Sequence, residues 1–239
     1  MKMPEVQQFL GMSPTELIQL FEKLGEPRYR ADQLFRGLHE ERVESVGDIT
    51  ALPASLRSRL EEIGVSRTLT LESRFISTDG TRRYLFHTVE GNPVETVFIP
   101  TESRDTICFS SQSGCPLKCD FCLTGKLGLL KNLTAGEIVE QVIHVLNDVY
   151  GPGGETPHGT NLVAMGEGEP FLNFENLIKA LDIMSEETGL FIVPDRVTVS
   201  TAGIVPKIRE FAKLERRPHI AISLSSPNYA LRDRIMPIN

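Results

Sequence analysis

The chain has 239 residues, 40% of them hydrophobic and 24% charged, which is the balance of a folded globular protein rather than a disordered one. No apolar run reaches the roughly 20 residues of a membrane-spanning helix, and no basic segment followed by an apolar one opens the chain. We therefore expect a cytoplasmic protein with no membrane partner. The net charge of −7 predicts that any RNA-binding surface is a local patch.

Residues 1–65 are predicted to form a small helical accessory domain. Ser13 and Glu16 have the spacing of a helix N-cap and its capping-box partner, and Gly25 is placed to end that helix. Two more amphipathic segments follow, one at about residues 29–39 and one after residue 53. Their arginines are suited to phosphate contacts, although a charged helix face is more often simply solvated.

Residues 66–100 are predicted to form a short β meander that connects the helical domain to the rest of the chain. Turn signals at Asp79-Gly80 and at residues 90–92 separate three short strands. Glu95 lies in the last strand, where apolar residues dominate. A carboxylate near apolar surface has a raised pKa and can act as a base, whereas the simpler interpretation is a solvated strand face.

From residue 101 to residue 239 strands and helices alternate. The predicted strands are Thr106–Ser110, Asn161–Met165, Arg196–Ser200 and His219–Leu224. Alternation of this kind predicts an α/β fold with a parallel sheet and right-handed crossovers, in which ligands bind at the carboxyl ends of the strands. Four such units form only a partial (β/α) barrel, so either the sheet is open or the chain is incomplete.

All four cysteines lie between Cys108 and Cys122, and three of them have C-x3-C-x2-C spacing: Cys115, Cys119 and Cys122. Thiolates favour zinc, copper(I) or iron-sulfur clusters, and three thiolates leave one iron of a four-iron cube without a protein ligand. The alternatives are a zinc site completed by a distant histidine and a disulfide with one spare thiol. The five histidines lack the spacing of zinc ligands, so the cluster interpretation is favoured.

A glycine-rich turn, Gly166–Pro170, follows the second predicted strand of the repeating part. It lacks the G-x-G-x-x-G spacing of a dinucleotide site, and on its own it indicates a tight loop. At a strand end, however, glycines allow the backbone to approach a ligand closely, and Glu169 can pair with an ammonium group.

The cysteine spacing, with Phe121 before the last cysteine, resembles the signature of the radical S-adenosylmethionine (SAM) enzymes. This resemblance implies a 4Fe-4S cluster whose open iron binds the amino and carboxylate groups of SAM. One electron then splits the sulfonium and releases a 5'-deoxyadenosyl radical. The Gly-Glu-Gly-Glu-Pro turn is similar to the G-x-G-E-P motif that holds the methionyl amino group in these enzymes.

Longer runs resemble the RlmN and Cfr family of adenine methyltransferases over nearly the whole chain. These runs are Y-R-A-D-Q-L-F, V-E-T-V-F-I-P, C-F-S-S-Q-S-G-C, N-L-T-A-G-E-I-V-E-Q-V, M-G-E-G-E-P-F-L-N, V-S-T-A-G-I-V-P and R-D-R-I-M-P-I-N. Agreement in this order is more specific than any single motif.

The resemblance implies a role for each matching residue. Cys115, Cys119 and Cys122 hold the cluster. SAM is contacted by Gly168, Glu169, Ser200, Ser223, Leu224 and Ser225. Glu95 accepts the proton from the adenine, and Cys108 attacks a methylated-cysteine adduct to release the product. Two positions depart from the family: Glu167 stands where methionine is usual, and Ser225 replaces a frequent histidine.

The function implied is methylation of adenine C2 in 23S ribosomal RNA and in transfer RNA through a methylcysteine intermediate. Because adenine C2 is electrophilic, it cannot attack the methyl group of SAM as a nucleophile. A carbon radical can add to it instead. The expected protein is a monomer that receives electrons from a donor such as flavodoxin or ferredoxin. Three alternatives stay open: a Cfr-type C8 methyltransferase, an iron-sulfur electron-transfer or sensor protein, and a zinc-stabilised RNA-binding module.

This chemistry needs two thiols besides the cluster ligands, and Cys108 is the one cysteine left. The methyl-carrying cysteine is therefore expected beyond Asn239, with residues 101–239 forming a barrel truncated at its C-terminus. On this interpretation the chain binds a cluster and SAM but does not methylate RNA by itself.

Overall fold

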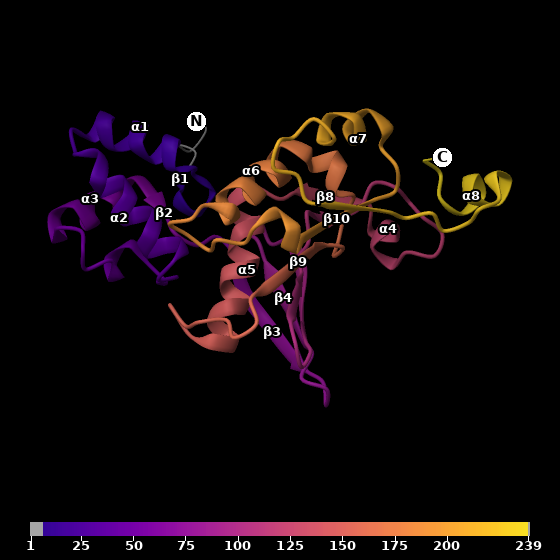
Figure 1. The fold of residues 1–239 in the computed structure, drawn as a ribbon, viewed down its shortest axis with the longest axis horizontal. Coiled ribbons are helices and arrows are strands. Elements are labelled where there is room, and N and C mark those ends of the chain that lie inside the picture. The colour runs from indigo at the N-terminus through magenta and orange to yellow at the C-terminus, as the bar shows by residue number, and fades with distance from the viewer. Residues whose placement is uncertain (1–6, 239) are drawn as a thin grey trace. The chain divides into compact units, whose positions relative to one another are not determined.

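A computed structural model describes residues 7–238 of the chain, with its elements labelled in Figure 1. Two segments lie outside the described residues. One is residues 1–6, which were part of the expectation that the chain opens without a leader. The other is Asn239, beyond which the methyl-carrying cysteine is expected. The chain divides into two compact units, and both are discontinuous in sequence. The first contains residues up to Leu69, Thr134–Pro157 and Lys179–Phe191; the second contains Thr70–Leu133, His158–Ile178 and the residues from Ile192 onward.

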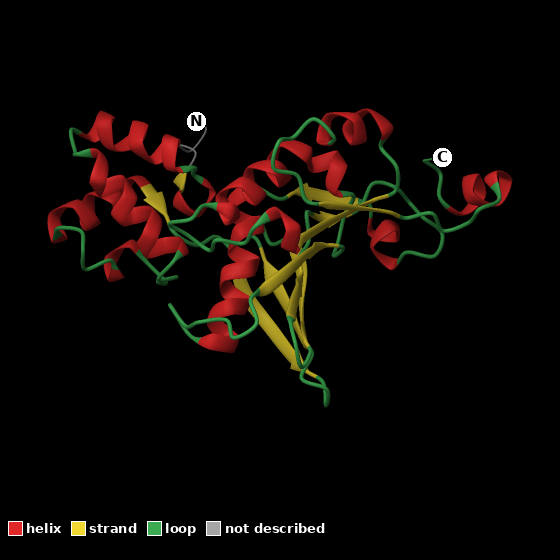
Figure 2. Ribbon diagram, viewed as in Figure 1, coloured by secondary structure: helices red, strands yellow, loops and turns green. Residues whose placement is uncertain are grey.

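The first unit is mainly helical (Figure 2). Its elements are β1 (Gln7–Gln8), η1 (Phe9–Gly11), α1 (Pro14–Leu24), α2 (Arg28–His39), η2 (Val46–Asp48), α3 (Ala54–Ile63), β2 (Gly64–Val65), α5 (Ala135–Tyr150) and the end of α6 (Phe174–Ser185). Strands β1 and β2 pair in parallel.

Helices α1 and α5 begin where the capping-box patterns predict. Ser13 accepts from the backbone N–H of Glu16, and Thr134 does the same for Glu137. In both helices the glutamate side chain accepts from the backbone N–H of the cap residue, at 2.8 Å, so two N–H groups at each helix start are satisfied. Gly25 ends α1 in the left-handed region, with φ +74°, as its position in the sequence predicts.

The second unit is built on a mixed sheet with the strand order β11-β10-β9-β6-β5-β4-β3. The strands are β3 (Thr70–Ile76), β4 (Arg82–His87), β5 (Pro93–Pro100), β6 (Asp105–Cys108), β9 (Thr160–Ala164), β10 (Val197–Thr201) and β11 (His219–Ile222). β6, β9, β10 and β11 run parallel, as expected, while β3 to β6 pair antiparallel. The meander and the parallel strands therefore form one continuous sheet, which the sequence did not indicate.

Smaller elements of this unit surround the cysteine motif and the strand ends. They are β7 (Gln112–Gly114), α4 (Leu123–Leu127), β8 (Leu129–Asn132), η3 (Pro170–Asn173), the start of α6, η4 (Pro194–Arg196), α7 (Val205–Phe211) and α8 (Tyr229–Ile235). β7 and β8 pair antiparallel and bracket the cysteine motif.

The register of the sheet places the candidate residues on one face. Cys108 pairs with Val97 on one side and with Val163 on the other, and Val163 also pairs with Thr198. Paired residues point to the same face of the sheet, and side chains along one strand alternate between the two faces. Glu95 lies two residues before Val97, and Ser200 lies two residues after Thr198. Both therefore share the face of Cys108. The alternate residues of β6, β9 and β10 are buried on the other face.

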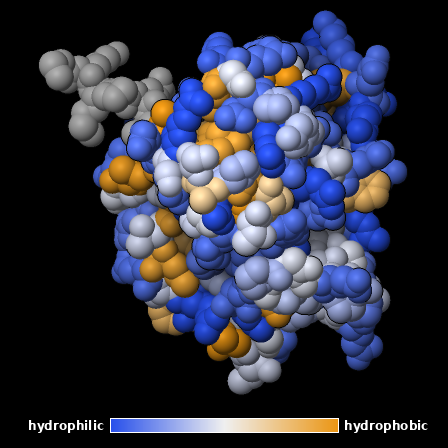
Figure 3. Space-filling model, turned by 90° about the vertical axis from the view of Figure 1, so that its left-hand side faces the viewer, coloured by the Kyte–Doolittle hydropathy of each residue, from blue (hydrophilic) through white to orange (hydrophobic). Residues whose placement is uncertain are grey.

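Among the described residues, no helix combines the length and the apolar character needed to cross a membrane. In the face shown in Figure 3, hydrophobic residues are scattered among hydrophilic ones rather than gathered into one large patch. Nothing on that face singles out a surface for docking.

Candidate active site

The cysteine motif is a tight loop closed by backbone hydrogen bonds. The N–H of Cys115 donates to the carbonyl of Gly128 at 3.0 Å, and the N–H of Cys122 donates to the carbonyl of Cys119 at 3.0 Å. Gly114 has φ +72°, and a Cβ there would collide with the backbone of Gly128, so a glycine is required before the first cysteine. These constraints hold the three thiols on one short segment.

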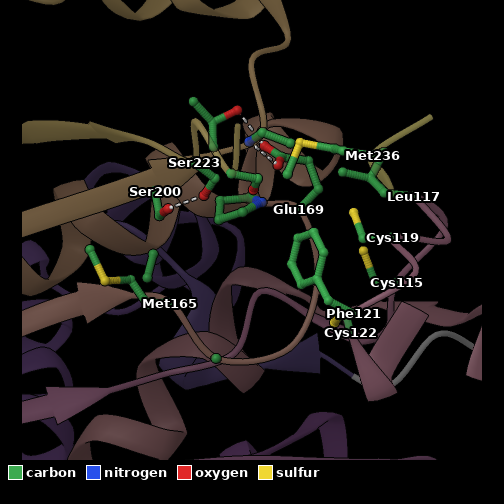
Figure 4. A pocket seen from close by; sticks show the side chains of 17 residues that line it. Cys115, Leu117, Cys119, Phe121, Cys122, Met165, Glu169, Ser200, Ser223 and Met236 are labelled. Atoms are coloured by element: carbon green, nitrogen blue, oxygen red, sulfur yellow. Dashed lines mark hydrogen bonds between the residues drawn. The ribbon is translucent and has the colours of Figure 1, made fainter. Parts of the chain in front are cut away.

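A cavity of about 390 Å³ lies at this loop and the strand ends (Figure 4). It is lined by Cys115, Leu117, Cys119, Phe121, Cys122, Ala164, Met165, Gly166, Gly168, Glu169, Pro170, Ser200, Thr201, Ala202, Ser223, Ser225 and Met236. Of the predicted site residues, the three cluster cysteines and five of the six SAM contacts line it. Leu224 is not among the lining residues, and its side chain is exposed.

The glycine-rich turn packs against the segment that leads from β6 to β7. A Cβ on Gly166 would lie 2.6 Å from the Ser110 hydroxyl, and one on Gly168, at φ +99°, would lie 2.6 Å from the Cβ of Gln112. The Gln112 side chain also accepts from the backbone N–H of Glu169 at 2.8 Å. Both glycines are therefore needed for close packing, and this packing positions Glu169 at the cavity.

Glu169 is buried and held by three donors. Its Oε1 accepts from the Thr201 hydroxyl at 2.6 Å and from the Phe171 N–H at 3.1 Å, and its Oε2 accepts from the Ala202 N–H at 2.7 Å. Burial raises the pKa of Glu169, against the lowering effect of these three donors. A cationic group in the cavity would favour the ionised form, so the site suits an ammonium ligand.

The ends of β10 and β11 supply hydroxyl groups to the cavity. The hydroxyls of Ser200 and Ser223 lie 3.2 Å apart (Figure 4), and Ser225 has a positive φ of 57°. Arg232 on α8 donates to the carbonyls of Ala202, at 2.6 Å, and Leu224, at 3.1 Å. This arginine therefore ties the two strand ends to the C-terminal helix of the unit.

Glu95 and Cys108 do not line the cavity, but they lie on the same sheet face as Ser200. The Cys108 thiol is bonded to the backbone N–H of Met165, a cavity residue, and burial raises its pKa. The Glu95 carboxylate meets Nη1 of Arg83 at 3.3 Å, and both side chains are about half exposed. The Cys108 thiol thus contacts a residue that lines the cavity, whereas the Glu95 carboxylate is paired with Arg83 on the same sheet face.

Within residues 7–238, no three His, Cys, Asp or Glu side chains are gathered as one metal ion requires. A four-iron cube makes a different demand, because each thiolate binds a separate iron. Burial and the neighbouring thiols raise the pKa of Cys115 and Cys119, and for Cys119 this outweighs the lowering effect of Arg232, so the thiolate form needs a further positive charge. A soft, cationic iron centre supplies that charge, and the three-thiol set beside an open cavity fits it.

Sequence reasoning missed several residues that build the cavity. Thr201 and Ala202 hold Glu169, and Met236 packs against Cys119 and Ala202. Thr201 and Ala202 lie in the V-S-T-A-G run, and Met236 lies in the R-D-R-I-M-P-I-N run. Both runs resemble the family, but the resemblance assigned no role to these three residues. The only signal available was therefore their place inside those runs.

Comparison with known protein families agrees with this geometry. Residues 109–239 match the radical SAM superfamily, and residues 7–65 match the N-terminal domain of ribosomal RNA large subunit methyltransferases. The chain belongs to the radical SAM superfamily.

Two curated relatives of the chain are both named as RlmN RNA methyltransferases. The chain is 45% identical over 233 residues to a probable dual-specificity RNA methyltransferase RlmN of Koribacter versatilis, covering 91% of this chain and 66% of that protein. It is 43% identical over 232 residues to the dual-specificity RNA methyltransferase RlmN of Pseudomonas putida (strain W619), covering 96% of this chain and 60% of that protein. The chain thus spans about three fifths to two thirds of the length of these curated relatives.

The fold has a solved counterpart. A radical SAM methyltransferase from Sphaerobacter thermophilus superimposes with a TM-score of 0.92 at 37% identity, over 98% of this chain and 68% of that one. The α/β fold of radical SAM type predicted from the sequence is confirmed.

Proposed function

We propose that the protein takes part in radical SAM methylation of RNA, at adenine C2 of 23S ribosomal RNA and of transfer RNA, through a methylcysteine intermediate. One observation carries the proposal: the three cysteines of the C-x3-C-x2-C motif and Glu169 line a single cavity. The relatives named RlmN support an RNA substrate. The choice of C2 and of both RNA classes rests on the family resemblance, as does an electron donor such as flavodoxin or ferredoxin.

Each residue has a part in this proposal. Cys115, Cys119 and Cys122 hold the 4Fe-4S cluster, which with bound SAM supplies a carbon radical. Glu169, oriented by its three donors, binds the amino group of SAM. The remaining contacts to SAM are assigned to Gly168, Ser200, Ser223, Leu224 and Ser225.

Two residues on the sheet face shared with Ser200 complete the reaction on the RNA in this proposal. Glu95 accepts the proton from the adenine carbon, and Cys108 attacks the sulfur adduct that links protein and base. Both lie on the sheet face that continues to Ser200, which supports an adenine bound over this face. The raised pKa of Cys108 keeps it a thiol at rest, and loss of its proton is therefore part of its turnover.

Anaerobic reconstitution tests the metal centre. The unaltered chain should bind about four irons and four sulfides, whereas Cys119→Ala should retain less than about a tenth of them because two thiolates hold the cube poorly. Cys108→Ala is the matched control, since it removes a thiol outside the ligand set and should leave the iron content unchanged. Zinc without sulfide in the unaltered chain would contradict the cluster.

Assays with SAM and RNA test the reaction. We expect SAM to bind the reconstituted chain. Once a cysteine-bearing C-terminal segment is restored, we expect mass spectrometry of nucleosides to identify the methylated adenine as 2-methyladenosine. A cluster without SAM binding would favour an electron-transfer or sensor protein. 8-Methyladenosine would favour the Cfr-type reaction.

A further inference from the structure

A second cavity, of about 370 Å³, lies in the second unit at the amino ends of the parallel strands, opposite to the strand ends that form the candidate active site. It is lined by Arg104, Thr106, Asn161, Leu162, Val163, Asp195, Arg196, Thr198 and His219. The two cavities share no lining residue. A volume of this size is typical of small-molecule sites. The cavity has no part in the function proposed above.

Polar side chains from four neighbouring strands form one side of this cavity. Thr106 on β6 pairs with Asn161 on β9, and Thr198 on β10 pairs with His219 on β11. Thr106 lies two residues before Cys108, so these side chains share the sheet face of Cys108. Two hydroxyls, an amide and an imidazole are thus available to donate hydrogen bonds to one ligand.

Arg196 is held at the cavity by its contacts. Gly159 has φ +67°, and a Cβ on it would lie 2.9 Å from the guanidinium carbon of Arg196, so the glycine leaves room for this position. Nη1 of Arg196 donates to the carbonyl of His158 at 3.3 Å and to Oδ1 of Asn161 at 3.4 Å. Within residues 7–238, Nε and Nη2 have no hydrogen-bond partner. Arg196 therefore keeps donors for a ligand.

Arg104 brings a second guanidinium group to the cavity. Its main chain is fixed by Thr101, whose hydroxyl accepts from the Arg104 N–H at 3.1 Å and donates to the Arg104 carbonyl at 2.6 Å. In the part of the chain that the structure describes, no group accepts a hydrogen bond from the Arg104 guanidinium. Asp195 is the single carboxylate among the lining residues, so the two arginines give the cavity a net positive charge.

We infer that this cavity binds a phosphate group, carried by a small phosphate ester. The planar guanidinium fork matches two phosphate oxygens, and hydroxyl and amide donors suit the remaining oxygen. A terminal phosphate has three free oxygens and a phosphodiester has two, so this number of donors favours the terminal group. The inference does not rest on the proposed RNA methylation, because the cavity is separate from the candidate active site.

Calorimetric titration of the unaltered chain with ribose 5-phosphate at low salt tests the site. We expect one equivalent to bind, and ribose without the phosphate not to bind. Arg104→Gln and Arg196→Gln should each weaken binding about tenfold, because each removes a charge-assisted donor. Arg209→Gln is the matched control, since Arg209 is an exposed arginine on α7 outside the cavity and its loss should leave the affinity unchanged.

Two further measurements separate binding from folding. Far-UV circular dichroism of each variant should match that of the unaltered chain, and Arg104→Gln removes a guanidinium that holds no other described residue in place. Arg196→Lys keeps the charge without the planar fork, so it should bind more weakly than the unaltered chain and more tightly than Arg196→Gln. Equal affinities in all the arginine variants would overturn the site, as would no binding by the unaltered chain at millimolar ribose 5-phosphate.

Competition with RNA identifies the source of the phosphate. If a short single-stranded RNA does not displace ribose 5-phosphate, the site belongs to a small phosphate ester, as inferred. Displacement that is lost in Arg104→Gln would overturn that assignment and make the RNA backbone the source of the bound phosphate.

Discussion

Glu169 depends on donors from outside its own turn, and the shortest of its hydrogen bonds comes from the Thr201 hydroxyl at 2.6 Å. The sequence pointed to Glu169 because a carboxylate in a glycine-rich turn followed a predicted strand. It did not point to Thr201, because that contact depends on β9 and β10 being neighbours in the sheet, which periodicity along the chain does not reveal.

We predict that Thr201→Val weakens SAM binding about tenfold. The substitution keeps the shape of the side chain but removes one of three donors, so the buried carboxylate is less readily ionised and attracts the ammonium group less. Calorimetric titration of the reconstituted protein with SAM measures the effect. Thr198→Val, earlier on the same strand, is the control and should bind SAM normally. Equal affinities in both variants would show that Thr201 does not orient Glu169.

At the scale of elements, the helices were predictable and the cysteine hairpin was not. Ser13 and Thr134 mark helix starts through side-chain chemistry that is local in sequence. β7 has three residues, Gln112–Gly114, too few to show alternation, and its pairing with β8 depends on the positive φ of Gly114. Local patterns therefore predict capped helices well and short, glycine-dependent strands poorly.

Helix α5 is anchored within the first unit by the carboxylate of Glu140. It accepts from the side-chain nitrogen of Gln8 at 3.0 Å, from the N–H and hydroxyl of Thr68 at 2.8 and 3.1 Å, and from the N–H of Leu69 at 3.0 Å. The side chain is almost fully buried. One residue thus satisfies four donors from two distant segments of the chain.

We predict that Glu140→Ala lowers the free energy of unfolding by about 2–4 kcal/mol, because it leaves buried donors without an acceptor. Glu140→Gln should cost less, since its amide oxygen still accepts. Urea denaturation followed by far-UV circular dichroism gives the comparison. Glu22→Ala, on the exposed side of α1, is the control and should change stability by less than about 0.5 kcal/mol. If Glu140→Ala also changed the free energy of unfolding by less than about 0.5 kcal/mol, the four hydrogen bonds would not stabilise the unit.

At the scale of the molecule, the alternation of strands and helices was enough to predict the parallel part of the sheet. The proposed division into 1–65, 66–100 and 101–239 stays a prediction. The compact units in the structure are discontinuous, because α5 and the end of α6 group with the N-terminal helices. An amphipathic period shows that a helix buries one face, but it does not identify the partner that covers that face.

The charge of the whole chain sets an expectation for its affinity for RNA. Acidic residues outnumber basic ones, 32 to 25, and several basic side chains are engaged within the protein: Arg36 with Glu40, Arg83 with Glu95, Lys131 with Glu90 and Lys207 with Glu175. These ion pairs engage four of the 25 lysine and arginine side chains. RNA binding is therefore expected to depend on a small number of contacts rather than on an extended basic surface.

We predict a shallow salt dependence for RNA binding. With about three phosphate contacts to single-stranded RNA, the affinity should fall roughly 20-fold between 50 and 200 mM salt, a slope of about −2 in log affinity against log salt. Fluorescence anisotropy with a labelled RNA hairpin measures it, and a basic RNA-binding peptide in the same assay is the control that should show a steep slope. A slope steeper than about −5 would show that a large basic surface forms despite the acidic balance. No binding at 50 mM salt would contradict the RNA substrate itself, because the electrostatic attraction is strongest there.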